Sequence, residues 1–227
     1  MTVKAQLHRI IGFSLGVALL AGAASAAEVS APDAASTLTF VEVRSDAVEH
    51  AKQLLREATK ALHRDAPAVH TELLQDLARP ERLLIVEESI GADAPQAPSL
   101  AALDSISIAP PNHRTNRAFA GSAAATGADA GALYVMTHVD LIPPNLAKGE
   151  ALLQELARAG RASAGNVRFE VWRQTDRPNH FNLIAVWRAR RDFDAFNAST
   201  PAREFRSGVA PSLGALYDER LYRSVSE

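Results

Sequence analysis

Hydrophobic positions along the chain change their spacing in the same order twice. Residues 38–43 and 133–139 are rich in β-branched and aromatic side chains, which predicts two strands. After each strand, hydrophobic residues recur every three or four positions, which predicts one helix from Ser45 onward and another after Pro143. Two strands around an Arg-Pro turn follow each helix, over residues 69–77 and 82–89 in the first half and 167–173 and 181–187 in the second.

These two halves are related by an internal repeat. Residues 69–73 align with residues 167–171 at an offset of 98, and the same offset places Arg79-Pro80 on Arg177-Pro178. Further on, Asn112-His113-Arg114 aligns with Asp218-Glu219-Arg220 at an offset of 106, so the second copy is eight residues longer there. The extra residues surround a helix predicted over 193–205, which precedes a last strand over 216–222. The element order is therefore β-α-β-β-α-β twice, and the first copy has lost part of its second helix.

Each copy has the element order of a ferredoxin-like unit, a four-stranded antiparallel sheet with helices on one face. Strands with hydrophobic residues on both sides argue against leaving the other face in water. We therefore expect an α+β fold in which repeats over residues 37–117 and 133–225 join their sheets into one intramolecular barrel. The chain would then be a monomer that acts as its own pseudo-dimer. Residues 118–132, rich in Ala and Gly, predict the linker between the repeats.

Residues 1–26 have the pattern of a secretory signal peptide. Lys4 and Arg9 precede a hydrophobic run over residues 10–21, and small residues lead to Ala26. A run of about 12 residues is shorter than the ~20 needed to span a bilayer, so we expect cleavage after Ala26 and no stable membrane anchor. An uncleaved helix on the membrane surface is the alternative. The prediction is export, into the periplasm of a bacterium.

Composition narrows the chemistry. The 227 residues are 47% hydrophobic and 22% charged, which is enough to form a core without covalent cross-links. The net charge is −2 and basic residues are scattered, which predicts no nucleic-acid partner. The absence of cysteine excludes disulfides, thiolate catalysis, iron–sulfur clusters and cysteine-type zinc sites. Residues 27–227 also lack the motifs of P-loop proteins, dinucleotide-binding domains, zincins and α/β-hydrolases.

Several stretches of the second half form a recognisable pattern. They are Gly165-Asn166-Val167-Arg168-Phe169-Glu170-Val171, Arg177-Pro178-Asn179-His180-Phe181, Val186-Trp187, the aromatic residues Phe193, Phe196 and Phe205, Ala210-Pro211, and the run from Leu216 to Tyr222. In these residues the second half resembles the antibiotic biosynthesis monooxygenase superfamily of dimeric α+β barrels, which includes quinol monooxygenases and haem-degrading enzymes. Members often have a Glu two residues before the Trp, where this chain has Ala185, and a His where it has Asn197-Ala198-Ser199. The first half has Glu87 at the Glu position and Ser89 at the Trp position.

The resemblance implies a monooxygenase that oxidises a small aromatic molecule, such as a quinol, with dioxygen and without a metal or other cofactor. We expect its site between the second-half sheet and the helices. The candidate catalytic residues are His138, Asn182 and Trp187, whose polar groups could hold a phenolic proton or stabilise reduced oxygen. Candidate substrate-binding residues are the aromatic Phe193, Phe196, Phe205 and Tyr217.

Other interpretations stay open. Trp187 could be a core aromatic residue and His138 a hydrogen-bonded structural one, while Trp172 is expected between the two sheets. The decay of the first copy and the missing His favour an exported barrel that binds a small molecule without catalysis. A haem-binding or haem-degrading protein would need His138 or His180 as the iron ligand.

Overall fold

The computed structural model of this chain describes residues 34–91, 93–121, 128–129 and 131–225. The predicted signal peptide and residues 122–127 and 130 of the predicted linker lie outside the described residues. Within the described part of the chain, no helix combines the length and the hydrophobicity that crossing a membrane requires.

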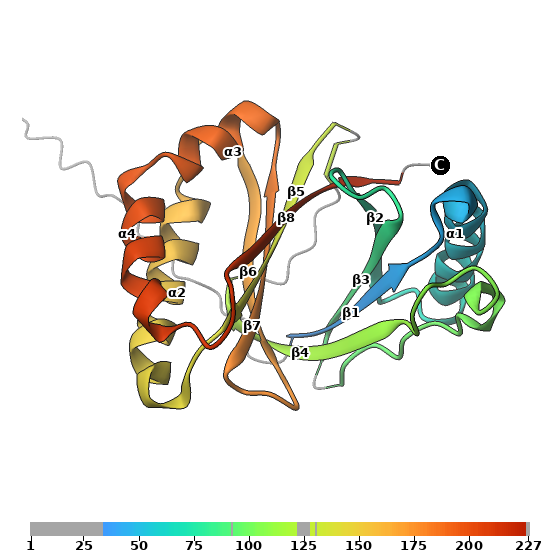
Figure 1. The fold of residues 1–227 in the computed structure, drawn as a ribbon, viewed down its shortest axis with the longest axis horizontal. Helices are drawn as coiled ribbons and strands as arrows, with labels where there is room; N and C mark the ends of the chain where they lie inside the picture. Colours follow the sequence, from blue (N-terminus) through green and yellow to red (C-terminus); the bar gives the residue numbers. More distant parts are fainter. Residues whose placement is uncertain (1–33, 92, 122–127, 130, 226–227) are drawn as a thin grey trace, which may run out of the picture.

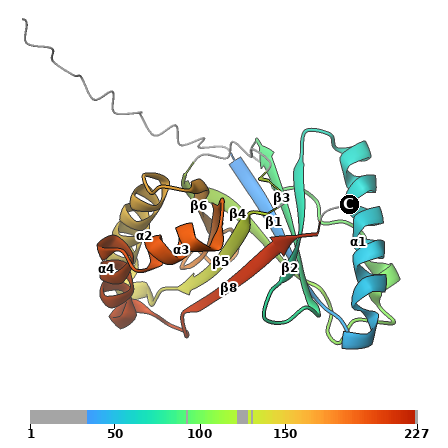
Figure 2. The same cartoon turned by 90° about the horizontal axis from the view of Figure 1, so that it is seen from above.

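Eight strands close into a single barrel between two layers of helices (Figures 1 and 2). The strands are β1 Ala34–Glu42, β2 His70–Asp76, β3 Arg82–Ile90, β4 Asn112–Ala120, β5 Leu133–Asp140, β6 Asn166–Gln174, β7 His180–Trp187 and β8 Asp218–Ser224. The helices are α1 Val48–Asp65, α2 Leu146–Arg161, α3 Arg190–Asn197 and α4 Thr200–Val209. Helix α1 packs outside the first-half strands, and α2, α3 and α4 pack outside the second-half strands (Figure 1).

The order of strands around the barrel is β1-β3-β2-β8-β5-β7-β6-β4, so each half contributes one antiparallel four-stranded sheet. The sheets meet where β2 pairs with β8 and where β4 pairs with β6. Closure pairs the edge strands that each sheet would otherwise expose. The predicted pair of ferredoxin-like repeats in one pseudo-dimeric barrel is confirmed.

Several element boundaries differ from the sequence prediction, and two of them lie near the site or the predicted linker. Strand β4 continues to Ala120 and pairs with β6, so the first three residues of the predicted linker lie in a strand. The helix expected over 193–205 is two helices, because Ser199 adopts an extended conformation and its hydroxyl caps α4 by accepting from Ala202 N at 3.4 Å. In the first half, the described residues between β3 and β4 hold only the short 3₁₀ turn Ala101–Leu103, so the reduction of the second helix goes further than the predicted loss of part of it.

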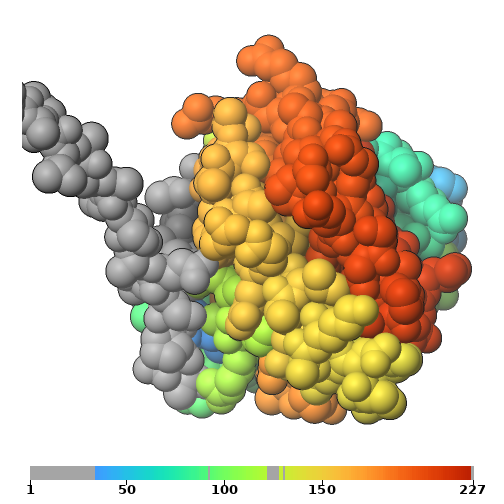
Figure 3. Space-filling view, turned by 90° about the vertical axis from the view of Figure 1, so that its left-hand side faces the viewer, coloured from blue at the N-terminus to red at the C-terminus, as the bar shows by residue number. Residues whose placement is uncertain are grey.

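The barrel has three hydrophobic clusters, one inside it and one under each layer of helices. Trp172, which is 1% exposed, lies in the inner cluster, as predicted for the core between the sheets. Close contact under α2 depends on Gly160, because a Cβ there would lie 2.2 Å from Phe169 Cδ2. Seen from outside, α2 and α4 lie against each other and cover the second-half sheet (Figure 3). Each second-half strand therefore has one face that packs under the helices and one that turns into the barrel interior, and a candidate site residue lies on one or the other.

Candidate functional site

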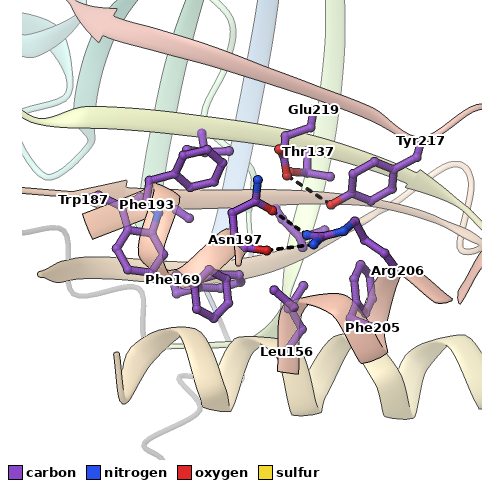
Figure 4. Close-up of a pocket in the computed structure, with 15 residues that line it drawn as sticks. Thr137, Leu156, Phe169, Trp187, Phe193, Asn197, Phe205, Arg206, Tyr217 and Glu219 are labelled. Atoms are coloured by element: carbon purple, nitrogen blue, oxygen red, sulfur yellow. Dashed lines mark hydrogen bonds between the residues drawn. The ribbon is translucent and has the colours of Figure 1, made fainter. Parts of the chain in front are cut away.

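A small cavity lies between the second-half sheet and its helices (Figure 4). Its volume is ≈30 Å³, whereas small-molecule pockets commonly measure about 300–1,000 Å³. Its walls are mostly apolar and include Val135, Leu156, Phe169, Leu183, Ala185, Trp187, Phe193, Phe196, Ala202 and Phe205. As it stands, the cavity has room for about one water-sized group.

Aromatic side chains form one end of this cavity. The indole of Trp187 stacks on Phe196 with ring centroids 5.0 Å apart, and Phe193 and Phe169 complete the group. Trp187 is fully buried, and its Nε1–H has no hydrogen-bond partner among the described residues. A buried N–H donor without a partner costs stability, so it is available to a polar atom that enters the cavity.

The other end of the cavity is polar. Tyr217 Oη donates a hydrogen bond to Glu219 Oε2 at 3.2 Å, and Thr137 lies beside both groups (Figure 4). Nearby, Arg206 donates to the side-chain and backbone oxygens of Asn197, the latter at 2.7 Å from Nη2. Residue Glu219 is exposed, so this is the end closest to solvent.

Burial sets the acid–base properties of the polar end. Glu219 is exposed as a residue, but partial desolvation of its carboxyl on the cavity side raises the pKa of that group above its ordinary value, although the hydrogen bond from Tyr217 opposes the effect. Burial, reinforced by the Glu219 charge, also raises the pKa of the Tyr217 hydroxyl. The pair is therefore a neutral phenol donating to a carboxylate whose affinity for a proton is enhanced.

Strand alternation places these side chains on one face. Residues 133, 135, 137 and 139 of β5, residues 181, 183, 185 and 187 of β7, and residues 217, 219 and 221 at β8 turn toward the helices. The predicted residues Trp187, Phe193, Phe196, Phe205 and Tyr217 all line the cavity. Their roles in binding or catalysis remain predictions.

His138 and Asn182 lie on the opposite face of the same sheet, in the barrel interior. They are directly paired between β5 and β7, and His138 Nδ1 lies 3.1 Å from Asn182 Oδ1. Their positions are one residue out of phase with Thr137 and Leu183, which line the helix-side cavity. The expectation that either residue forms the polar element beside Trp187 is therefore wrong, because the sheet separates them from that cavity.

Inside the barrel, polar side chains form a chain of contacts that begins at Asp140. His180 Nε2 lies 3.5 Å from Asp140 Oδ1, and His180 Nδ1 lies 3.3 Å from His138 Nε2. Asn182 Nδ2 then donates to Asn116 Oδ1 at 2.8 Å. The adjoining cavity measures ≈120 Å³, which is too small for a haem, so the interior does not fit that group with either His as ligand. Among the described residues, no three His, Asp or Glu side chains gather in a way that could hold a metal ion.

Sequence patterns did not predict four polar residues that line the helix-side cavity: Thr137, Asn197, Arg206 and Glu219. Alternation could have found Glu219, which is two residues after Tyr217 and therefore on the same face of β8. Glu219 accepts a hydrogen bond from Tyr217, whereas Asp218 pairs with Arg220 on its own strand. No sequence pattern distinguishes Arg206 as a site residue, because α3 and α4 carry several other arginines.

Comparison with known proteins shows what the second half and the overall fold are similar to. Residues 132–208 match the sequence model of the family described as antibiotic biosynthesis monooxygenase. No curated protein matches the chain. Several solved structures of similar fold extend over both halves.

A Fusobacterium nucleatum protein described as a "putative monooxygenase" shares 11% identity, with 86% of this chain and 93% of that chain covered and a TM-score of 0.73. An anthrone oxidase-like protein shares 12% identity, with 87% and 94% covered and a TM-score of 0.64. A ferredoxin-fold protein from Listeria monocytogenes, described as related to antibiotic biosynthesis monooxygenases, shares 14% identity, with 84% and 95% covered and a TM-score of 0.55. At these identities, the shared feature is the fold.

Proposed function

We propose that the cavity between the second-half sheet and its helices is the active site of a monooxygenase, supported by the match of residues 132–208 to the antibiotic biosynthesis monooxygenase family. The substrate is a small electron-rich aromatic molecule with an acidic hydroxyl or carbon-bound hydrogen, such as a quinol or an anthrone. The observation that carries the proposal is the combination of aromatic walls at Trp187 and Phe196 with a polar end at Tyr217 and Glu219.

The first step is removal of a proton from the substrate. Glu219 is the base, because burial raises the pKa of its carboxyl and so strengthens its hold on a proton. Tyr217 donates to the same carboxylate and fixes its orientation. Since Glu219 is exposed at the rim, the proton can then pass to solvent.

Oxygen transfer follows from the substrate anion. The anion gives one electron to dioxygen, and the resulting radical pair combines to form a C–O bond and a peroxide. Loss of water from the peroxide leaves a carbonyl, so one oxygen atom enters the product and the other leaves as water. The Trp187 Nε1–H, buried and without a partner among the described residues, is the donor that stabilises the reduced oxygen. This route draws its electrons from the substrate and needs no cofactor.

Substrate entry requires the cavity to enlarge from ≈30 Å³. Its outer wall is formed by Leu156 of α2 and by α3 and α4, and the last two have 8 and 10 residues. Isolated helices of this length are marginal in water, so their position depends on the packing of Phe193, Phe196 and Phe205 against the sheet. We place the opening motion in these two helices.

The test is oxygen consumption by the purified protein with a panel of quinols and anthrones. We expect turnover by the wild-type protein and a loss of about 10²–10⁴-fold in kcat for Glu219→Gln, the range for a general base. Tyr217→Phe should lower kcat by less. Tyr134→Phe is the matched control, since Tyr134 lies in the barrel interior and donates to Glu72 at 2.7 Å.

Absence of oxygen uptake with every substrate would end the catalytic proposal. The second candidate function is a barrel that binds a small molecule without converting it. The observation that favours this function is the small volume of the closed cavity. A compound that co-purifies with the protein, is not turned over and is lost from a Phe196→Ala variant would support that function instead.

The proposed setting is the periplasm, after removal of residues 1–26. The support is the charge and hydrophobicity pattern of those residues. N-terminal sequencing of the protein recovered from a periplasmic fraction checks this proposal. A first residue of Ala27 is expected, and retention of Met1 in the cytoplasm would contradict it.

A further inference from the structure

A second cavity opens at one end of the barrel interior, on the opposite face of the sheet from the proposed active site. It measures ≈120 Å³, about the volume of four waters at ~30 Å³ each. Strands of both halves contribute to it: Phe40 and Arg114 come from the first half, and His138, Asn182 and Tyr222 come from the second. The cavity therefore exists only because the two repeats close into one barrel.

Arg114 lines this cavity with a positively charged group that could bind a ligand. Its guanidinium lies over the Phe40 ring, with Cζ 4.5 Å from the centroid, and its Nε donates to Asn112 Oδ1 at 3.0 Å. Toward the cavity, Nη1 makes only long contacts of 3.4 Å, to Asn182 Oδ1 and to His138 Nδ1. Two contacts thus fix the plane of the guanidinium, and its Nη1 group is directed toward two residues that line the cavity.

Arg114 forms no ion pair with a carboxylate of the described residues. The nearest acidic residue of the cavity, Asp218, is engaged by Arg220, whose Nε and Nη2 lie 2.9 and 2.8 Å from its two oxygens. Arg220 and Arg177 add to the positive field at Arg114, and Asp218 opposes it. Partly buried guanidinium groups are commonly paired with an acid, and none of these residues supplies one.

The remaining walls suit a small ligand with an apolar part. Phe40, Met136 and Tyr222 present carbon atoms to the cavity, and Asn182 is fully buried and held in place by Asn116. Burial and the neighbouring guanidinium lower the pKa of His138, so its imidazole is neutral near pH 7 and does not replace Arg114 as the cation. The positive charge, the hydrogen-bonding groups and the size of the cavity define one ligand class.

We propose that this end of the barrel binds a small monocarboxylate, held by a bidentate contact to Arg114 with its apolar part against Phe40 and Tyr222. The planar fork of an arginine matches the two oxygens of a carboxylate. The site is separate from the proposed active site, because the second-half sheet lies between them. Its existence does not depend on monooxygenase activity.

The experiment is an NMR titration of the full chain with propionate at constant ionic strength, with propionamide as the uncharged counterpart. We expect saturable shifts in β4, β5 and β8 and a dissociation constant of about 1–10 mM, reasonable for a ligand of so few atoms. Propionamide should bind at least about tenfold more weakly, because it offers no charge-assisted contact.

Two variants separate the site from a general charge effect. Arg114→Gln should weaken propionate binding by about tenfold or more, while Arg114→Lys, which keeps the charge but not the fork, should weaken it by less. Arg117→Gln is the matched control, since Arg117 is exposed on the same strand and the substitution removes the same charge. Spectra with native dispersion show that each variant is folded.

Three results would overturn the proposal. These are no saturable binding of propionate to the wild-type protein, equal affinity for propionamide, and equal losses in Arg114→Gln and Arg117→Gln. Loss of oxygen uptake in the active-site variants, or its absence in the wild type, has no bearing on these outcomes.

Discussion

Glu87 should make the protein less stable as the pH rises from 4.5 toward 8. Glu87 is 0% exposed, and neither of its carboxylate oxygens has a hydrogen-bond partner among the described residues. It lies on the face of β3 that turns toward α1, between Thr37 and Thr71 on the neighbouring strands. Burial alone raises the pKa of Glu87 from 4.5 to about 8.

The size of the effect follows from proton linkage. Below pH 4.5 the carboxyl is protonated in both the folded and the unfolded chain, so it causes no loss of stability. Above that pH the unfolded chain loses the proton and the folded protein keeps it until about pH 8. At pH 7, about 2.5 pH units above the ordinary value, roughly 1.4 kcal/mol per unit gives a destabilisation of about 3 kcal/mol.

The assay is urea unfolding of wild type and Glu87→Gln between pH 4 and pH 8.5, followed by far-ultraviolet circular dichroism and by the fluorescence of Trp172 and Trp187. We expect the two proteins to differ little at pH 4 and the variant to be more stable by about 3 kcal/mol at pH 7. Glu49→Gln is the matched control, because the Glu49 side chain is 82% exposed on α1. A difference that is the same at both pH values would refute the reasoning, since packing rather than ionisation would then be its cause.

Three further substitutions test the packing, each by urea unfolding with Tm as a second measurement. Arg168→Gln should destabilise by about 3–5 kcal/mol, because Arg168 donates to Glu72 Oε2 at 2.7 Å and its removal leaves that carboxylate buried without its cation; an unchanged midpoint would contradict this. Gly160→Ala should cost about 1–3 kcal/mol, because the new Cβ would meet the Phe169 ring, and a neutral effect would show that α2 can shift. Phe196→Ala should cost about 3–5 kcal/mol through the cavity it leaves against Trp187, and a much smaller cost would mean that α3 collapses into the space.

Much of the fold could be predicted because it depends on local patterns. The change from alternating to helical spacing, met twice, is enough to place the strands and helices and to identify two repeats. The split at Ser199 and the end of β4 at Ala120 were missed, since a capped break between short helices and a strand through small residues leave only weak traces in a hydrophobic pattern.

Local patterns also predicted part of the site, namely its aromatic lining, but, apart from Tyr217, not its polar end. Alternation already places Asn182 on the other face of its strand from Phe181 and Trp187, but it does not say which face meets the helices. The aromatic lining of the cavity was identified from residue type. The pairing of Tyr217 with Glu219 and the position of Arg206 depend on how α4 packs over β8, which no local pattern records.

By itself, the sequence determined the duplication, the order of elements, the two sets of residues on each strand, and the family that the second half resembles. Only the tertiary structure decided what the two sets face and which distant residues meet. Arg168 reaches Glu72 across 96 positions of sequence, and Arg114 reaches His138 across the seam between the repeats. Such contacts depend on closure of the barrel, in which β2 pairs with β8 and β4 pairs with β6. No local pattern determines this closure, because the pairing of distant strands is set by the packing of whole sheets.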